Sequence, residues 1–114
     1  MQGEGSEMEG VQALLSALGL CAKARALVYG TPMVCEALKG NKKPFLVLCA
    51  SDNAPNTNKR IADRCAFYGV LLADTHTTGE ELARALGKGG HLAAVAITDA
   101  QLCHLVTSKL ALLK

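Results

Sequence analysis

Apolar and polar positions follow two different periods along this chain, and the two periods predict helices and strands in turn. Apolar side chains within 11–22 recur at three- and four-residue intervals, which is typical of one face of a helix. Residues 6–9 have the spacing of a capping box, so we expect this helix to open there. The run 45–50 is continuously apolar between turn residues, which predicts a central strand covered on both faces.

The remaining elements alternate in the same way. Three further runs have the length and composition of strands: 27–29, 70–73, which is predicted to be buried, and 92–97, which is apolar. Cap residues, in one case followed by proline, predict four further helix starts: Thr31, Asn56 or Thr57, Thr78, and 98–101. Strands that alternate with helices predict an α/β layered domain. We therefore expect a single domain over 11–114, preceded by a flexible acidic tail over 1–10.

Charge is unevenly distributed although the formal net charge is only +2. Residues 1–10 hold three acidic and no basic side chains, whereas residues 23–64 hold eight basic and three acidic ones. A basic first half suits an anionic partner, although ordinary solubilising charge also explains it. Aromatic residues make up 4% of the chain and Trp is absent, which disfavours a recognition surface of stacked aromatic rings.

Candidate chemistry is sparse. The five cysteines have no C-x-x-C spacing and fit core positions, which favours free thiols in a reducing cytoplasm and leaves a reactive cysteine as a weak alternative. The three histidines lack metal-ligand spacing, so no metal is expected. No apolar run reaches the ~18 residues that a membrane span requires, and the acidic start is unlike a signal peptide. The loop 87–90 does not fit a phosphate-binding template. We expect neither a cofactor nor catalysis.

A set of short motifs in a fixed order resembles a known family. The segments that carry the resemblance extend from Leu14-Leu15-x-x-Leu18-Gly19-Leu20, through Ala37-Leu38-Lys39-Gly40 and Leu46-Val47-Leu48-x-Ala50-x-Asp52, to Ala94-Val95-Ala96-Ile97-Thr98-Asp99. Over about residues 11–106 the chain is similar to the kink-turn RNA-binding ribosomal proteins of the L-seven-Ae and L-thirty-e group, including small bacterial members of the YlxQ type. The resemblance implies a three-layer α/β/α sandwich with a mixed four-stranded sheet.

The resemblance also implies where structured RNA would bind. The N-terminal end of the second helix would contact the RNA backbone and base edges, through Gly30, Thr31, Pro32 and Met33, with Glu36 one turn further on and Lys39 supplying charge nearby. Two loops would join it. Their residues are Asp52, Asn53 and Ala54 in the first loop, and Thr75, His76 and Thr77 in the second. The implied function is a non-catalytic, ribosomal-protein-like RNA-binding protein that recognises kinked or structured RNA in the bacterial cytoplasm.

The chain departs from the family pattern at the second helix. Strong kink-turn binders usually place Asn-Glu where this chain has Pro32 and Met33, and Lys where it has Glu36. A glutamate beside a phosphate replaces an attraction with a repulsion, which costs ~1–3 kcal/mol at low salt. The alternative is therefore a protein-interaction module of the same fold that has lost kink-turn recognition.

Overall fold

The structure is a computed structural model that describes the backbone of residues 2–113 and the side chains of residues 9–113. The elements follow in chain order: α1 (Gln2–Lys23), β1 (Leu27–Tyr29), α2 (Thr31–Lys39), β2 (Leu46–Cys49), α3 (Pro55–Tyr68), β3 (Leu71–Asp74), α4 (Gly79–Ala85), β4 (Ala94–Ile97) and α5 (Ala100–Leu110). Within this part of the chain no helix is both long and apolar enough to cross a membrane.

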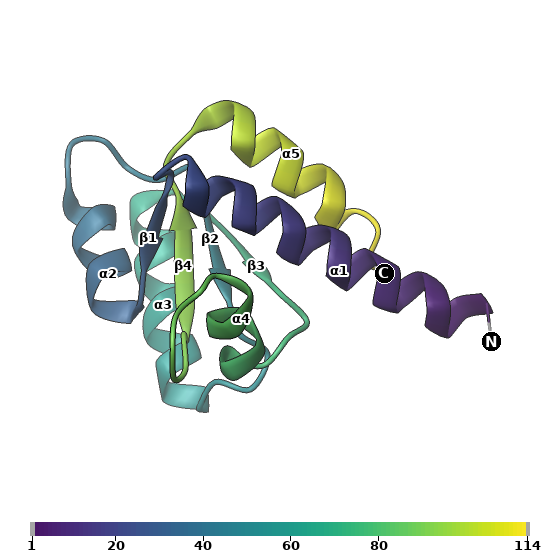
Figure 1. Ribbon diagram of the computed structural model, residues 1–114. Helices are drawn as coiled ribbons and strands as arrows, with labels where there is room; N and C mark the ends of the chain where they lie inside the picture. The colour runs from purple at the N-terminus through teal and green to yellow at the C-terminus, as the bar shows by residue number, and fades with distance from the viewer. Residues whose placement is uncertain (1, 114) are drawn as a thin grey trace.

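The four strands form one mixed sheet in the order β1-β4-β2-β3. Strand β4 is antiparallel to both β1 and β2, whereas β3 is parallel to β2. Helices cover both faces of this sheet (Figure 1). The predicted three-layer α/β/α sandwich with a mixed four-stranded sheet is therefore confirmed.

Each face of the sheet contributes alternate side chains to its own core. Leu46, Leu48, Val95 and Ile97 pack with α1, α4 and α5, whereas the intervening Val47, Cys49, Ala94 and Ala96 pack with α2 and α3. Strands β2 and β4 are buried at every position, which explains why their sequences are continuously apolar. Helices α1 and α5 lie side by side on the first face, and α1 continues beyond the body of the domain (Figure 1).

Three helices begin earlier than the cap residues predict. Helix α1 begins at Gln2 instead of 6–9, so the capping-box spacing does not mark its start, and the flexibility of residues 1–10 stays a prediction. Helix α2 is capped by Gly30 instead of Thr31, because the Gly30 carbonyl accepts the first helical hydrogen bond from Val34. Helix α3 is capped by Ala54 instead of Asn56 or Thr57, and Pro55 suits the first turn because it lacks an N–H.

The position of strand β3 differs from the prediction that this strand is buried. The run 70–73 is predicted to be buried, but β3 is the edge strand of the sheet, with Leu71 74% and Leu72 37% exposed. A short apolar run shows that a strand forms, whereas its burial depends on the strand order, which local periodicity does not contain.

Candidate functional site

One edge of the sheet collects most of the connecting loops. Strands β1, β2 and β3 run in the same direction because β1 and β2 are both antiparallel to β4 and β3 is parallel to β2. Their carboxyl ends and the start of β4 therefore lie at the same edge, which we call the loop edge. The segments at the loop edge are the start of α2, residues 50–54, residues 75–78 and residues 86–93. In open α/β sheets, ligands bind outside the carboxyl ends of the strands.

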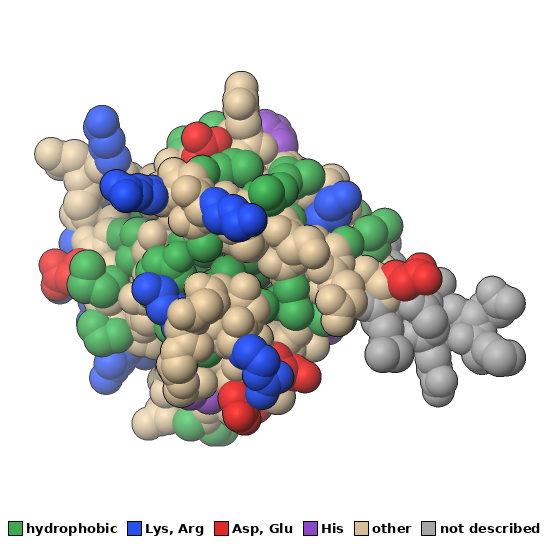
Figure 2. All heavy atoms as spheres, viewed as in Figure 1, with side chains coloured by type: hydrophobic (Ala, Val, Ile, Leu, Met, Phe, Trp, Pro, Cys, Tyr) green, Lys and Arg blue, Asp and Glu red, His purple; other side chains and the backbone are tan. Residues whose placement is uncertain are grey.

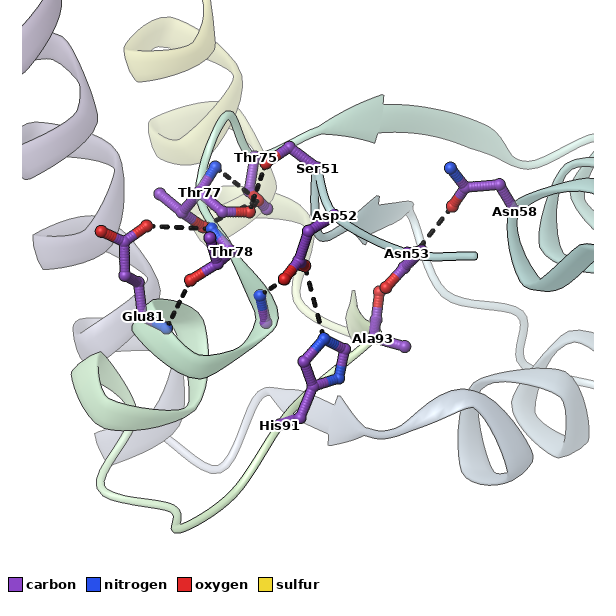
Figure 3. A network of polar contacts seen from close by, with 11 residues as sticks. Ser51, Asp52, Asn53, Asn58, Thr75, Thr77, Thr78, Glu81, His91 and Ala93 are labelled. Carbon is purple, nitrogen blue, oxygen red and sulfur yellow. Dashed lines mark hydrogen bonds and ion pairs between the residues drawn. The ribbon is translucent and has the colours of Figure 1, made fainter. Parts of the chain in front are cut away.

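Hydrogen bonds hold the loops after β2 and β3 together (Figure 3). The backbone N–H and the hydroxyl of Ser51 each donate to the Thr77 carbonyl, at 2.8 and 2.9 Å. The hydroxyls of Thr75 and Thr77 lie 2.9 Å apart, and both side chains are buried. Thr75 and Thr77 therefore shape this loop from within, and their hydroxyls do not reach the protein surface.

Neighbouring side chains accept two of the first N–H groups of α4, those of Gly79 and Glu81 (Figure 3). The Thr78 hydroxyl accepts the Glu81 N–H at 3.1 Å, and the Glu81 carboxylate accepts the Thr78 N–H at 2.9 Å, so the helix start predicted at Thr78 is confirmed and is a capping box. The Asp52 carboxylate accepts the Gly79 N–H at 2.9 Å and lies 3.3 Å from Nε2 of His91. The Gly79 N–H, and secondarily the His91 ring, hold the pKa of the Asp52 carboxyl below its ordinary value. Contacts with α4 and with the loop before β4 therefore hold the Asp52 side chain in place.

Asn53 links the same loop to β4 and, through β4, to α2. Its Nδ2 donates to the Ala93 carbonyl at 2.9 Å and to the Asn58 side chain at 3.0 Å (Figure 3). The next carbonyl, that of Ala94, accepts the Gly30 N–H at 2.8 Å. The structure thus brings the start of α2 and both predicted loops to the same edge of the sheet.

The start of α2 differs from the start of α4 because no side chain caps it. Gly30 has φ 88° and ψ 151°, a conformation that residues with a Cβ atom adopt only under strain. The N–H groups of Thr31 and Met33 make no hydrogen bond with the described part of the chain. Met33 is 59% exposed, and Glu36 is also exposed, 3.5 Å from the ammonium of Lys39. This helix end offers free donors and a positive dipole to an incoming anion.

The predicted site residues fall into two groups. Those that remain accessible are Pro32 and Met33 at the start of α2, Glu36 and Lys39 further along this helix and away from the loop edge, and Ala54 and His76 in the two loops, while Gly30 and Thr31 are half-buried. Those whose side chains are buried or bonded inside the domain are Asp52, Asn53, Thr75 and Thr77. His76 is exposed at the tip of its loop with φ 60°, a left-handed conformation that is uncommon outside glycine.

Two residues of the loop before β4 join the site without having been predicted. The ammonium of Lys88 lies 4.4 Å from the centroid of the Tyr29 ring, which packs on the face of the sheet covered by α1, α4 and α5, so this cation lies near the end of β1 on that face. His91 contacts Asp52 and stands directly over Gly79, where an added Cβ atom would meet its ring at 2.2 Å. Both contacts join segments far apart in the chain, so no local spacing indicates them.

Burial makes the cysteines of the core poor candidates for thiol chemistry. Burial, reinforced by the neighbouring Cys65 and Asp74, raises the pKa of the Cys49 thiol to about 11, and burial is also the first cause that raises the pKa of Cys21 and Cys65. These thiols therefore remain protonated and poorly nucleophilic at neutral pH. The described residues contain no cluster of three or more His, Cys, Asp or Glu side chains arranged to hold a metal ion.

Most of the chain matches a known protein family. Residues 12–106 match the ribosomal protein L7Ae/L30e/S12e/Gadd45 family. The chain belongs to this family. The match confirms the resemblance drawn from the motifs, and it covers all of the loop edge. The RNA-binding protein YlxQ of Bacillus subtilis (strain 168) is 34% identical over 82 residues, which are 72% of this chain and 79% of that protein.

Solved structures support the same fold for this member of the L7Ae/L30e/S12e/Gadd45 family. A protein with unknown function from Bacillus halodurans C superposes with a TM-score of 0.77 at 28% identity, covering 86% of this chain and 96% of that one. The 15.5kD RNA-binding protein of Giardia lamblia superposes with a TM-score of 0.73 at 20% identity, covering 90% of this chain and 86% of that one. The family description and the YlxQ name refer to ribosomal and RNA-binding proteins, not to enzymes.

Proposed function

We propose that this chain is a non-catalytic RNA-binding protein that recognises a kinked or structured RNA at the loop edge. The observation that carries the proposal is the open start of α2, with its free N–H groups and exposed Met33, at the same edge of the sheet as the accessible His76 loop. Membership of a ribosomal protein family and similarity to a protein named as RNA-binding support the choice of RNA.

The roles follow from the geometry of the open helix end. The N–H groups of Thr31 and Met33, together with the helix dipole, favour a phosphate. Met33 offers an apolar surface to an exposed base, and the His76 imidazole can stack on a base or donate to a phosphate. Lys88 supplies a cation at the same edge. This is recognition of RNA shape and unstacked bases rather than of a duplex sequence.

Glu36 opposes this binding and provides the sharpest test. We would titrate the protein against an RNA duplex that contains a kink-turn and against a straight duplex of equal length. A preference of about tenfold or more for the kinked RNA, equal to about 1.4 kcal/mol, is expected. Glu36→Lys should strengthen binding to the kinked RNA by about 1–3 kcal/mol at low salt, because a repulsion becomes an attraction.

A matched control separates local from general charge effects. Glu9→Lys makes the same charge change on the exposed surface of α1, away from the loop edge. Glu9→Lys should leave the preference for kinked RNA unchanged. If the parent protein and Glu36→Lys bind the kinked and straight RNAs equally weakly, the proposal is wrong.

A second candidate function is a protein-interaction module that keeps the fold without kink-turn recognition. The exposed Glu36 and Met33 favour it, since neither side chain suits a phosphate. Absence of RNA preference in the parent protein, together with a clear gain in Glu36→Lys, would favour this second function.

The first RNA to test is ribosomal RNA, because the family description names ribosomal proteins. We also propose a reducing compartment, the cytoplasm, because all five cysteines are free in the structure and four of them are buried in the core.

A further inference from the structure

The outward face of α3 carries a groove that the segments of the loop edge do not form. Its volume is about 590 Å³, and it extends along the whole helix. Seven residues line this groove, which we call the α3 groove: Asn56, Lys59, Arg60, Asp63, Arg64, Phe67 and Tyr68. Their spacing of three and four residues places them on one stripe of the helix.

Positive charge dominates the α3 groove. Asp63 is the acidic residue of its lining, and its carboxylate already binds the Lys59 ammonium at 2.9 Å. Arg60 and Arg64 form no ion pair with the described part of the chain. On the face of the molecule shown in Figure 2, Lys and Arg side chains are spread out with hydrophobic side chains between them, so no single basic patch forms there. Arg60 and Arg64 lie one turn apart on α3 and have no acidic partner among the described residues. The α3 groove therefore suits an anionic ligand.

Aromatic rings close the far end of the α3 groove. Phe67 is 81% exposed, although it is among the largest apolar side chains of the protein. It meets Tyr68 edge to face, with ring centroids 4.9 Å apart and an interplanar angle of 89°. The ammonium of Lys43 lies 4.8 Å from the Tyr68 centroid and adds a further cation. A ring beside guanidinium groups is the combination that holds single-stranded nucleic acid, with a base on the ring and phosphates on the arginines.

The position of α3 relates its groove to the loop edge. Helices α2 and α3 pack side by side on one face of the sheet, and both begin at the loop edge (Figure 1). The groove starts at Asn56, two residues after the loop that holds Asp52, Asn53 and Ala54. A strand that leaves an RNA bound at the loop edge can therefore continue along α3.

We propose that the α3 groove binds a single-stranded RNA segment, with one base stacked on Phe67 and backbone phosphates at Arg60 and Arg64. The inference rests on the proposed function for the choice of RNA, but it uses residues outside the loop edge. The groove and the loop edge can therefore be tested on separate RNAs.

The first probe is a fluorescein-labelled hexaadenylate, followed by fluorescence anisotropy at low salt. Phe67→Leu keeps an apolar side chain but loses the planar ring, and should weaken binding about 5- to 50-fold, whereas Phe67→Tyr should bind like the parent. The double variant Arg60→Ala/Arg64→Ala should reduce the slope of log affinity against log salt by about 1.4. Lys23→Ala/Lys109→Ala removes the same charge from α1 and α5, on the opposite face of the sheet, and should leave that slope unchanged.

The second probe is a short kink-turn duplex without single-stranded overhangs. Phe67→Leu should bind this duplex like the parent, while Glu36→Lys should bind it more tightly. If the parent binds hexaadenylate but shows no preference for the kink-turn, the proposed function fails and the α3 groove stands. If the parent does not bind hexaadenylate, or if Phe67→Leu binds it equally well, the α3 proposal is overturned. Self-association in sedimentation that Phe67→Leu abolishes, with hexaadenylate binding unchanged, would instead assign the groove to a protein contact.

Discussion

Helices α2 and α4 begin at the same edge of the sheet, but side chains accept N–H groups in the first turn of α4 and not in the first turn of α2. At α4, Thr78 and Glu81 form a reciprocal cap, and Asp52 accepts the Gly79 N–H from another loop. At α2, Gly30 caps the helix with its backbone alone, and Met33 beside it is 59% exposed. Side chains of the domain therefore bind the Gly79 and Glu81 N–H groups of α4, while the first N–H groups of α2 remain available to a ligand.

This difference separates residues that shape the loop edge from residues that can bind a partner. Most polar side chains of the two loops are engaged inside the domain, as Ser51, Thr75 and Thr77 show. Polarity in a loop is therefore a weak guide to binding here. The better guide is a polar group that the fold exposes and leaves without an internal partner.

The largest expected loss of stability comes from the backbone of the open helix start. Gly30→Ala forces a Cβ atom onto φ 88° and should lower the free energy of unfolding by about 1–3 kcal/mol. Gly19→Ala is the matched control, since Gly19 lies within α1 and an added Cβ meets nothing within 4 Å. It should raise stability by about 0.5–1 kcal/mol. Urea unfolding checks both, and equal stability of Gly30→Ala and the parent would show that the α2 start relaxes without cost.

The two threonines at the helix starts test the contrast directly. Thr78→Ala removes the side-chain cap of α4 and should destabilise the protein by about 1 kcal/mol. Thr31→Ala makes the same chemical change at α2, where no side chain caps the helix, and should change stability by less than about 0.5 kcal/mol. Thermal unfolding of the parent and of both variants measures these two changes in stability. Similar losses in the two variants would mean that Thr31 has a capping role and that the contrast is wrong.

The sequence predicts the architecture better than it predicts these helix starts. Alternating helical and strand patterns lead to the correct α/β class, the family resemblance leads to the three layers, and the uninterrupted apolar character of β2 and β4 reflects burial on both faces. The predicted starts of α2 and α3 were wrong because Gly30 and Ala54 cap these helices, and a residue that caps a helix through its backbone has no side-chain pattern in the sequence. The α4 start was correct because its cap is made by the side chains of Thr78 and Glu81.

The candidate site is predictable only in part, for a related reason. The chain order of strands and loops identifies the loop edge, but the contacts of His91 with Asp52 and Gly79 join segments that are far apart in sequence. Phe67 is a different case. It follows Arg60 and Arg64 at helical spacing, so its place on the exposed stripe of α3 could have been found from the sequence alone.

A smaller effect is expected where His91 packs over Gly79. A Cβ atom at position 79 would lie 2.2 Å from the His91 ring, so Gly79→Ala must displace that ring. The ring is half exposed and can move, which limits the loss to less than about 1 kcal/mol. In a His91→Ala background the same substitution should be neutral or stabilising, with a coupling of about 0.5–1 kcal/mol in a double-mutant cycle. A coupling near zero would show that His91 does not hold its position over Gly79.

The smallest expected effect is the acid sensitivity of the contact between Asp52 and the start of α4. The Gly79 N–H holds the pKa of Asp52 below its ordinary value in the folded protein, so the folded state binds the proton less readily than the unfolded chain does. The contribution of this carboxylate is therefore complete above the unfolded pKa of about 3.9 and is lost as the pH falls through the lower folded value. Asp52→Asn removes that titration, so its free energy of unfolding should fall less steeply than that of the parent below about pH 4. Glu36→Gln, at the open start of α2, is the comparison variant, because the Glu36 carboxylate accepts no hydrogen bond from the backbone of the described residues. If Asp52→Asn and the parent lose stability in parallel on acidification, the Gly79 contact does not bias the protonation of Asp52, and the α4 start owes its order to the Thr78 and Glu81 cap alone.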